Sequence, residues 1–165
     1  MATPVSDIRN LFNEKISLYR ELLECLEQEK EILKKPDVNL LWNISSRKHG
    51  LAAKIESARR GILNALTNAS IHHDMNVVTF RISKILKLLP DTVSENLKQV
   101  HVTLVGIKEE IHGLAKESKR FVEGYLEIIN DLIGVLANQG KNKAVYGEHP
   151  SQIPERTNLF LHKEV

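Results

Sequence analysis

The feature that most constrains the fold is a ladder of apolar residues from Val93 to Val135. Successive members lie three or four residues apart, and twelve of the thirteen are apolar or aromatic. This spacing places them on one face of an α-helix and is typical of a coiled-coil seam. We therefore predict a helix over residues 92–138, which would be about 70 Å long at ~1.5 Å per residue. The ladder consists of Val93, Leu97, Val100, Leu104, Ile107, Ile111, Leu114, Ser118, Phe121, Tyr125, Ile128, Leu132 and Val135.

Local signals beside the ladder refine this prediction. The stretch Thr92-Val93-Ser94-Glu95 has the pattern of a capping box, in which the Thr and Glu side chains satisfy backbone amides at the helix start. Gly106, Gly113 and Gly134 lie at multiples of seven residues from one another. Glycine weakens a helix by up to about 1 kcal/mol relative to Ala. The repeat therefore predicts a close approach by a neighbouring helix, with coincidence as the alternative.

Two helical patterns precede the ladder. Over residues 5–34, apolar residues repeat every seven positions in two columns, and Lys15 lies in the column between them. Pro36 ends this helix because proline disfavours helical geometry at the residue before it. Asp37 can cap a second amphipathic helix over residues 37–68. A tight turn between two such helices predicts an antiparallel hairpin.

The rest of the chain completes the domain organisation. A connection over residues 68–76 leads to a short helix over 77–89, which stops at Pro90. We predict an all-α fold, an elongated antiparallel helical bundle or coiled coil with long helices. A single domain would cover residues 1–138, followed by a flexible C-terminal tail over 139–165.

The predicted helix lengths do not match. The hairpin arms would span only about 45 Å each, so the last helix exceeds them by about 20 Å of apolar seam. Either the 77–89 helix covers this excess or a partner helix does, and the sequence leaves both open. An exposed apolar seam of this size rarely goes unused.

Composition and charge exclude several classes of protein. The 23 basic and 21 acidic side chains are interspersed and give a net charge of +2, so no basic stripe favours nucleic acid. Cys25 is the one cysteine, which excludes an internal disulfide or a cysteine zinc cluster. The first residues lack the pattern of a signal peptide, and no apolar run approaches the ~18 residues of a membrane span. We expect a cytoplasmic protein without stable membrane insertion.

No pattern of residues predicts catalysis. Glu109 and His112 have the Glu-x-x-His spacing of di-iron bundles, but no second such motif occurs. His72-His73-Asp74 could bind a metal weakly, although a solvated loop is the better interpretation. We find no phosphate-cradling glycine loop and no nucleophile elbow. The prediction is a protein that is not an enzyme and has no catalytic residue, metal or cofactor.

Four stretches together resemble the FlgN family of flagellar type III export chaperones. LLECLEQEKEIL, residues 22–33, is similar to the family's leucine-rich first helix. PDVNLLWNISSRKHGLAAKIESARRGIL, residues 36–63, resembles its second helix. SKRFVEGYLEIINDLIGVL, residues 118–136, looks like its late helix, and AVYGEHPSQIPER, residues 144–156, resembles its tail.

The resemblance implies a function and partners. Members of the family would bind the C-terminal helical segments of hook-associated proteins, which form the hook–filament junction. They would prevent premature association and deliver these clients to the export gate. Components of the export gate or of the export ATPase are the further implied partners. The alternative is a generic coiled-coil adaptor or self-associating scaffold, in which the long seam pairs with its own copy as a homodimer.

The tail raises the question of where partners bind. Its Gly and Pro residues prevent a continuous helix, while its spaced apolar residues could anchor a client or dock at the export gate. We expect Tyr146 to be the leading contact; a frayed tail whose Leu-Phe-Leu tucks against the bundle is the alternative. The predicted partner-binding residues are Val145, Tyr146, Gly147, Ile153, Leu159, Phe160 and Leu161 in the tail and Phe121, Tyr125, Ile128 and Leu132 in the long helix.

Overall fold

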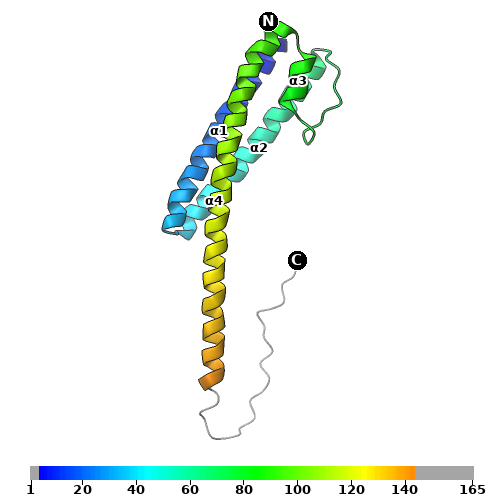
Figure 1. Cartoon of the computed structure of the whole chain (residues 1–165). Coiled ribbons are helices and arrows are strands. Elements are labelled where there is room, and N and C mark those ends of the chain that lie inside the picture. Colours follow the sequence, from blue (N-terminus) through cyan, green and yellow to red (C-terminus); the bar gives the residue numbers. More distant parts are fainter. Residues whose placement is uncertain (1–3, 144–165) are drawn as a thin grey trace. The chain divides into compact units, whose positions relative to one another are not determined.

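The computed structural model describes residues 4–143, with side chains over residues 6–140, and this part of the chain contains four helices and no strand (Figure 1). The predicted all-α fold of antiparallel helices is therefore confirmed. No helix within the described range has the length and hydrophobicity to cross a membrane. The helices are α1 (Pro4–Lys34), α2 (Val38–Asn68), α3 (Ile82–Leu88) and α4 (Asp91–Lys143).

The chain divides into two compact units, Met1–Gly124 and Tyr125–Val165. The first contains α1, α2, α3 and the beginning of α4, and the second contains the remainder of α4.

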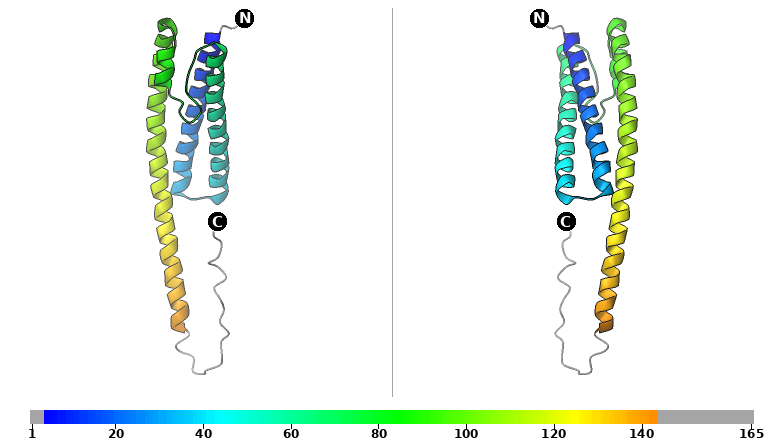
Figure 2. Two further views of the ribbon diagram at one scale, coloured as in Figure 1. Left: turned by 90° about the vertical axis from the view of Figure 1, so that its right-hand side faces the viewer. Right: turned by 90° about the vertical axis from the view of Figure 1, so that its left-hand side faces the viewer.

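Helices α1 and α2 form the predicted antiparallel hairpin (Figures 1 and 2). Helix α1 ends before Pro36, and the Oδ1 atom of Asp37 accepts a hydrogen bond of 3.0 Å from the amide of Leu40. Asp37 therefore caps α2 as its sequence position predicts. Farther along the hairpin, Lys48 of α2 forms an ion pair with Glu29 of α1.

Within the first unit, α4 runs in the same direction as α1 and antiparallel to α2. The ammonium of Lys108 lies 5.5 Å from the centroid of the Tyr19 ring. Further along both helices, Lys30 Nζ pairs with Glu117 at 3.0 Å. Contacts therefore advance together along α1 and α4 (Figure 2).

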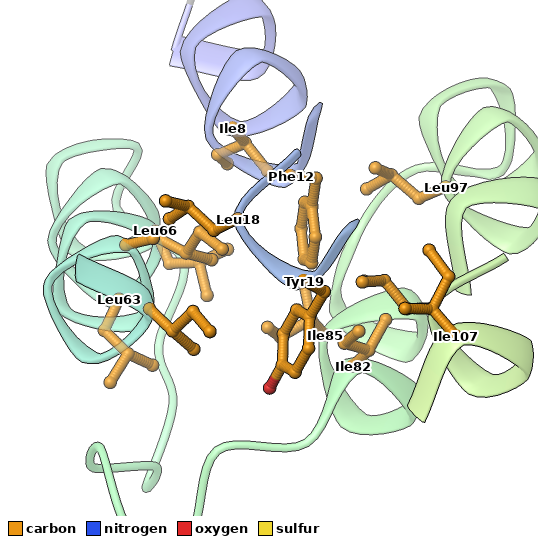
Figure 3. Packing of buried hydrophobic residues seen from close by; sticks show 14 of the residues in the cluster. Ile8, Phe12, Leu18, Tyr19, Leu63, Leu66, Ile82, Ile85, Leu97 and Ile107 are labelled. Atoms are coloured by element: carbon orange, nitrogen blue, oxygen red, sulfur yellow. The ribbon is translucent and has the colours of Figure 1, made fainter. Parts of the chain in front are cut away.

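All four helices contribute to the core of the first unit (Figure 3). Full burial of one Leu, Ile or Phe side chain stabilises a fold by about 1.5–3 kcal/mol, so this cluster dominates the stability of the unit. The apolar periodicity of the sequence predicts these positions because they follow the helical repeat. Its fully buried apolar members are Phe12, Ile8, Ile62, Leu66, Ile85, Leu97, Leu104 and Cys25.

The prediction that three glycines mark a close helix approach is wrong. A Cβ atom built on Gly106, Gly113 or Gly134 would meet no described atom within 4 Å. The close approach occurs at Gly61 of α2, where a Cβ would lie 3.2 Å from Cδ2 of Leu11. The three glycines lie at exposed or half-exposed positions of α4, where no neighbouring helix packs against them in the structure.

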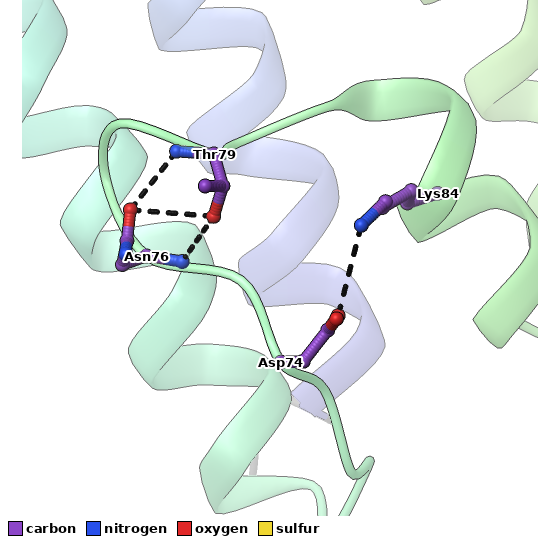
Figure 4. Close-up of polar contacts among 4 residues, drawn as sticks. All are labelled: Asp74, Asn76, Thr79 and Lys84. Atoms are coloured by element: carbon purple, nitrogen blue, oxygen red, sulfur yellow. Dashed lines mark hydrogen bonds and ion pairs between the residues drawn. The ribbon is translucent and has the colours of Figure 1, made fainter.

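The third helix is shorter than the predicted 77–89. The preceding residues form a turn, in which Oδ1 of Asn76 accepts a hydrogen bond of 2.9 Å from the backbone amide of Val78. It accepts a second, also of 2.9 Å, from the backbone amide of Thr79 (Figure 4). Thr79 Oγ1 in turn accepts from the Asn76 amide at 2.9 Å. These local bonds compete with helix formation, which delays the start of α3 to Ile82.

Helix α4 also departs from its predicted ends. It begins at Asp91, and the amides of Val93 and Ser94 donate to the Pro90 carbonyl at 3.0 and 2.9 Å. The predicted capping box is wrong, because Thr92 lies inside the helix and is not its N-cap. The Glu95 carboxylate accepts a hydrogen bond of 2.8 Å from Lys98. The helix ends at Lys143, beyond the predicted 138.

Candidate functional site

The second unit exposes a continuous series of large apolar side chains on α4. Each is more than half exposed, whereas Leu97 and Leu104 on the same helix are buried in the first unit. Soluble proteins rarely leave such a series open unless it binds a partner. The exposed residues are Leu126, Ile128, Ile129, Leu132, Ile133, Val135 and Leu136.

These side chains form one broad face of the helix. At ~100° per residue, they and Tyr125 occupy about half of the helix circumference. The opposite half carries Glu127, Asn130 and Asp131. An apolar stripe wider than ~100° is what a helix normally turns toward a core. We refer to Tyr125 together with the seven exposed residues as the exposed α4 face (the yellow to orange part of α4 in Figure 1).

The predicted binding residues of the long helix have different environments. Ile128 and Leu132 are 57% and 58% exposed and lie on the exposed α4 face. Tyr125 is half-buried, and Phe121 is a half-buried residue of the first unit. Their role in binding stays a prediction. The seven predicted residues of the tail lie outside the described residues.

Half of the residues on the exposed α4 face lie outside the predicted ladder. Leu126, Ile129, Ile133 and Leu136 step by three, four and three residues and form a second column beside the ladder. That signal is present in the sequence but is hidden by the more regular ladder. The structure adds the information that both columns are exposed.

A second candidate surface lies at the turn between α1 and α2. A cavity of about 710 Å³ opens there, and the exposed side chains of Val38 and Trp42 lie at the start of α2. Its lining is both acidic and apolar, which would suit a cationic amphipathic partner. It offers less apolar surface to a partner than the exposed α4 face does. The lining residues are Glu24, Glu27, Gln28, Glu31, Ile32, Leu40, Asn43, Ile44 and Arg47.

The histidine-rich connection does not assemble a metal site. His73 Nε2 lies 3.2 Å from the Leu63 carbonyl oxygen, and Asp74 pairs with Lys84 at 3.8 Å (Figure 4). Within residues 4–143, no three His, Cys, Asp or Glu side chains come together as metal ligands.

The cysteine and the Glu-x-x-His pair also lack the surroundings of an active site. Burial raises the pKa of the Cys25 thiol, which disfavours the reactive thiolate. Glu109 and His112 are both exposed on α4.

Comparison with known proteins identifies the family. Residues 1–152 match the family model described as FlgN protein, which includes all four helices. No curated protein and no solved structure matches the chain. FlgN proteins are cytoplasmic and non-catalytic. The chain therefore belongs to the FlgN family, the flagellar export chaperones that bind hook-associated proteins.

Proposed function

We propose that the exposed α4 face holds an amphipathic helical segment from the C-terminal part of a hook-associated protein. The observation that supports this proposal is the exposure of seven large apolar side chains over Leu126–Leu136. An amphipathic helix commonly binds by laying its apolar face against a complementary apolar surface. Such a complex would cover the apolar faces of both partners.

The energies suit a reversible chaperone. Burial of one Leu or Ile side chain contributes about 1.5–3 kcal/mol. Ordering a disordered client segment costs about 2–5 kcal/mol or more of the gross interaction energy. The free energy gained by burying several side chains therefore exceeds the cost of ordering the client segment. Because the ordering cost reduces the net affinity, the complex can still dissociate at export. Covering the client's apolar face would also prevent its premature association.

The binding face can be tested by replacing Ile128 and Leu132 with Asp together. Both side chains are exposed, so the double variant is expected to fold, as circular dichroism would verify. Loss of two buried contacts should weaken binding by about 3–6 kcal/mol, or more than a hundredfold. Isothermal titration calorimetry with the C-terminal segment of a hook-associated protein measures this change.

A matched control for that variant is Val102→Asp. Val102 is 64% exposed on α4 but belongs to the first unit. It should bind the client as the wild type does. Wild-type affinity in the double variant, or an equal loss in the Val102 variant, would contradict the proposed face.

The tail is proposed to contact the client or the export gate. Its support is the sequence alone, in which Tyr146 and the neighbours Val145 and Gly147 precede the anchors Ile153 and Leu159–Leu161. Deleting residues 144–165 leaves α4 complete. The deletion should weaken binding at least tenfold, either to the client or to an export-gate or export-ATPase component. Unchanged affinity for all of them would refute this role.

A homodimer through the exposed α4 face is the rival arrangement. Sedimentation velocity of the free protein and of its mixture with a client distinguishes the two. The chaperone arrangement predicts a mixed complex of defined stoichiometry. A self-associating scaffold would sediment as the same oligomer whether or not the client is present.

A further inference from the structure

Three basic side chains gather around Tyr19 inside the first unit. Lys15 of α1 is fully buried, and its ammonium has no hydrogen-bond partner. Arg59 of α2 donates from Nη2 to the Tyr19 hydroxyl at 3.2 Å, while its buried Nε has no partner. Lys108 of α4 places Nζ 5.5 Å from the centroid of the Tyr19 ring. Cations on three helices thus converge on one tyrosine.

A small cavity adjoins this cluster. Its volume is about 210 Å³, and Arg59, Arg81, His101 and Lys108 supply the ionisable groups of its wall. No acidic residue contributes to its lining. The remaining lining residues are Phe80, Ile82, Ser83, Leu104 and Val105.

Lys15 contacts Phe80, which lines this cavity. Its Nζ is 4.1 Å from the centroid of the Phe80 ring and 5.9 Å from that of Tyr19. Aromatic faces attract cations, but they do not neutralise them. Glu56 lines an adjoining cavity, and its carboxylate is already paired with Arg60.

The cluster has an excess of positive charge that the described residues do not balance. In the part of the chain that the structure describes, Arg59, Arg81 and Lys108 take part in no ion pair, and neither does Lys15. Of these four side chains, Lys15 is fully buried and Arg59 is half-buried, whereas Arg81 and Lys108 are exposed. Buried charges in proteins are normally paired. An anion in the cavity would supply the missing counter-charge and accept hydrogen bonds from arginine.

We infer that this basic cavity binds an oxyanion, a carboxylate or phosphate group, held by Arg59, Arg81 and Lys108. Cavities that enclose drug-sized ligands measure about 300–1,000 Å³, so this smaller one suits a single group rather than a nucleotide. The group can come from an acidic side chain of a bound protein segment or from free phosphate. Only the first source depends on the proposed chaperone function.

The protonation of Lys15 provides a second signature of binding. Burial, followed by the charges of Lys108 and Arg59, lowers its pKa to about 7. The groups that face it are Tyr19 on its own helix, Arg59 on α2, Phe80, and Lys108 on α4. A bound anion would raise this pKa, so binding near pH 7 should take up protons. Calorimetry in two buffers of different ionisation enthalpy detects that uptake.

The decisive experiment measures the binding of inorganic phosphate, and separately of acetate, at constant ionic strength and pH 7. Calorimetry and thermal unfolding of the full chain should show saturable binding to the wild type. Arg81→Gln should weaken it at least tenfold. Arg81 is exposed, so this variant is expected to fold even if Arg59→Gln does not.

The control variant is Arg20→Gln, which removes the same charge from an exposed position of α1 outside the cavity lining. It should bind phosphate as the wild type does. No saturable binding of either anion by the wild type, or equal binding by the Arg81 and Arg20 variants, would overturn the site. The Ile128/Leu132 double variant should retain anion binding, which separates this inference from the proposed function.

The source of the anion follows from competition. Where saturating phosphate weakens binding of the client segment to the wild type but not to Arg81→Gln, the segment supplies a carboxylate to the cavity. Where phosphate binds without affecting the segment, the cavity holds a free anion. Both results support an oxyanion site.

Discussion

Lys15 is the residue whose environment departs most from the pattern of its helix. Its column in the sequence is otherwise occupied largely by apolar residues, and the structure buries it completely without a hydrogen-bond partner for its ammonium. Burying an unpaired charge is costly, and proteins usually relieve the cost by neutralising the group. Burial lowers the pKa of Lys15 from 10.5 to about 7, so the side chain loses its proton more readily in the folded protein.

The effect of Lys15 on stability has a defined sign. Below about pH 7 the side chain is charged in both the folded and unfolded states, so the full cost of burial applies. Between about 7 and 10.5 the unfolded state binds more protons, and the free energy of unfolding rises with pH. The slope can reach about 1.4 kcal/mol per pH unit.

Lys15→Met should remove this dependence on pH. Because Met retains the shape of the side chain without its charge, the variant should also raise the free energy of unfolding at pH 7 by about 1–3 kcal/mol or more. Urea unfolding at several pH values between 6 and 10 measures both effects. Lys54→Met, at an exposed position of α2, is the control. Parallel pH profiles for Lys15→Met and the wild type would contradict the assignment.

Ser118 is a second residue with an unsatisfied polar group. It is the polar member of the α4 ladder, and its Oγ is buried without a partner. Ser118→Ala removes the hydroxyl and improves helix propensity, so it should raise the free energy of unfolding by about 1 kcal/mol. Urea unfolding against Ser83→Ala, an exposed serine, tests this. A clear loss of stability would indicate that the hydroxyl has a role.

At the scale of the element, the ends of the helices depend on single side chains. Asp37 caps α2 through its bond to the Leu40 amide. Asp37→Ala should lower the free energy of unfolding by about 0.5–2 kcal/mol. Asp37→Asn should stay close to the wild-type stability, because Asn also caps helices well. Thermal unfolding compares these variants with Asn39→Ala on the exposed first turn. Equal losses of stability in the Ala and Asn variants would show that the side-chain hydrogen bond to the Leu40 amide does not stabilise the start of α2.

The helices were predictable from the sequence, but several of their ends were not. Apolar periodicity and Pro36 predict α1 and α2 closely, because both act through local geometry. The turn around Asn76 could not be predicted, since a side chain there replaces bonds that a helix would otherwise make. The same limit explains the absent capping box, whose Glu95 pairs with Lys98.

At the scale of the whole molecule, sequence pattern does not distinguish a buried ladder from an exposed one. Leu104 and Leu132 occupy equivalent positions of the same ladder, yet Leu104 is fully buried and Leu132 is 58% exposed. Burial depends on which segments pack beside each turn, and a periodic pattern does not carry that information. The basic cavity was hidden for the same reason, because its side chains come from positions far apart in the chain.

In the proposed function the two units have different tasks. The first buries an apolar core that includes all four helices. The second presents an apolar face that is as wide as the face a helix normally packs against a core. In this unit that face is exposed. For a chaperone of hook-associated proteins, we propose this face as the place where a client binds.

Amide hydrogen exchange across the full chain, with and without the C-terminal segment of a hook-associated protein, tests this claim most directly. The account predicts that binding slows exchange over residues 125–136 at least tenfold and leaves the start of α2, residues 38–48, unchanged. Protection at the start of α2, with exchange over 125–136 unaltered, would contradict it.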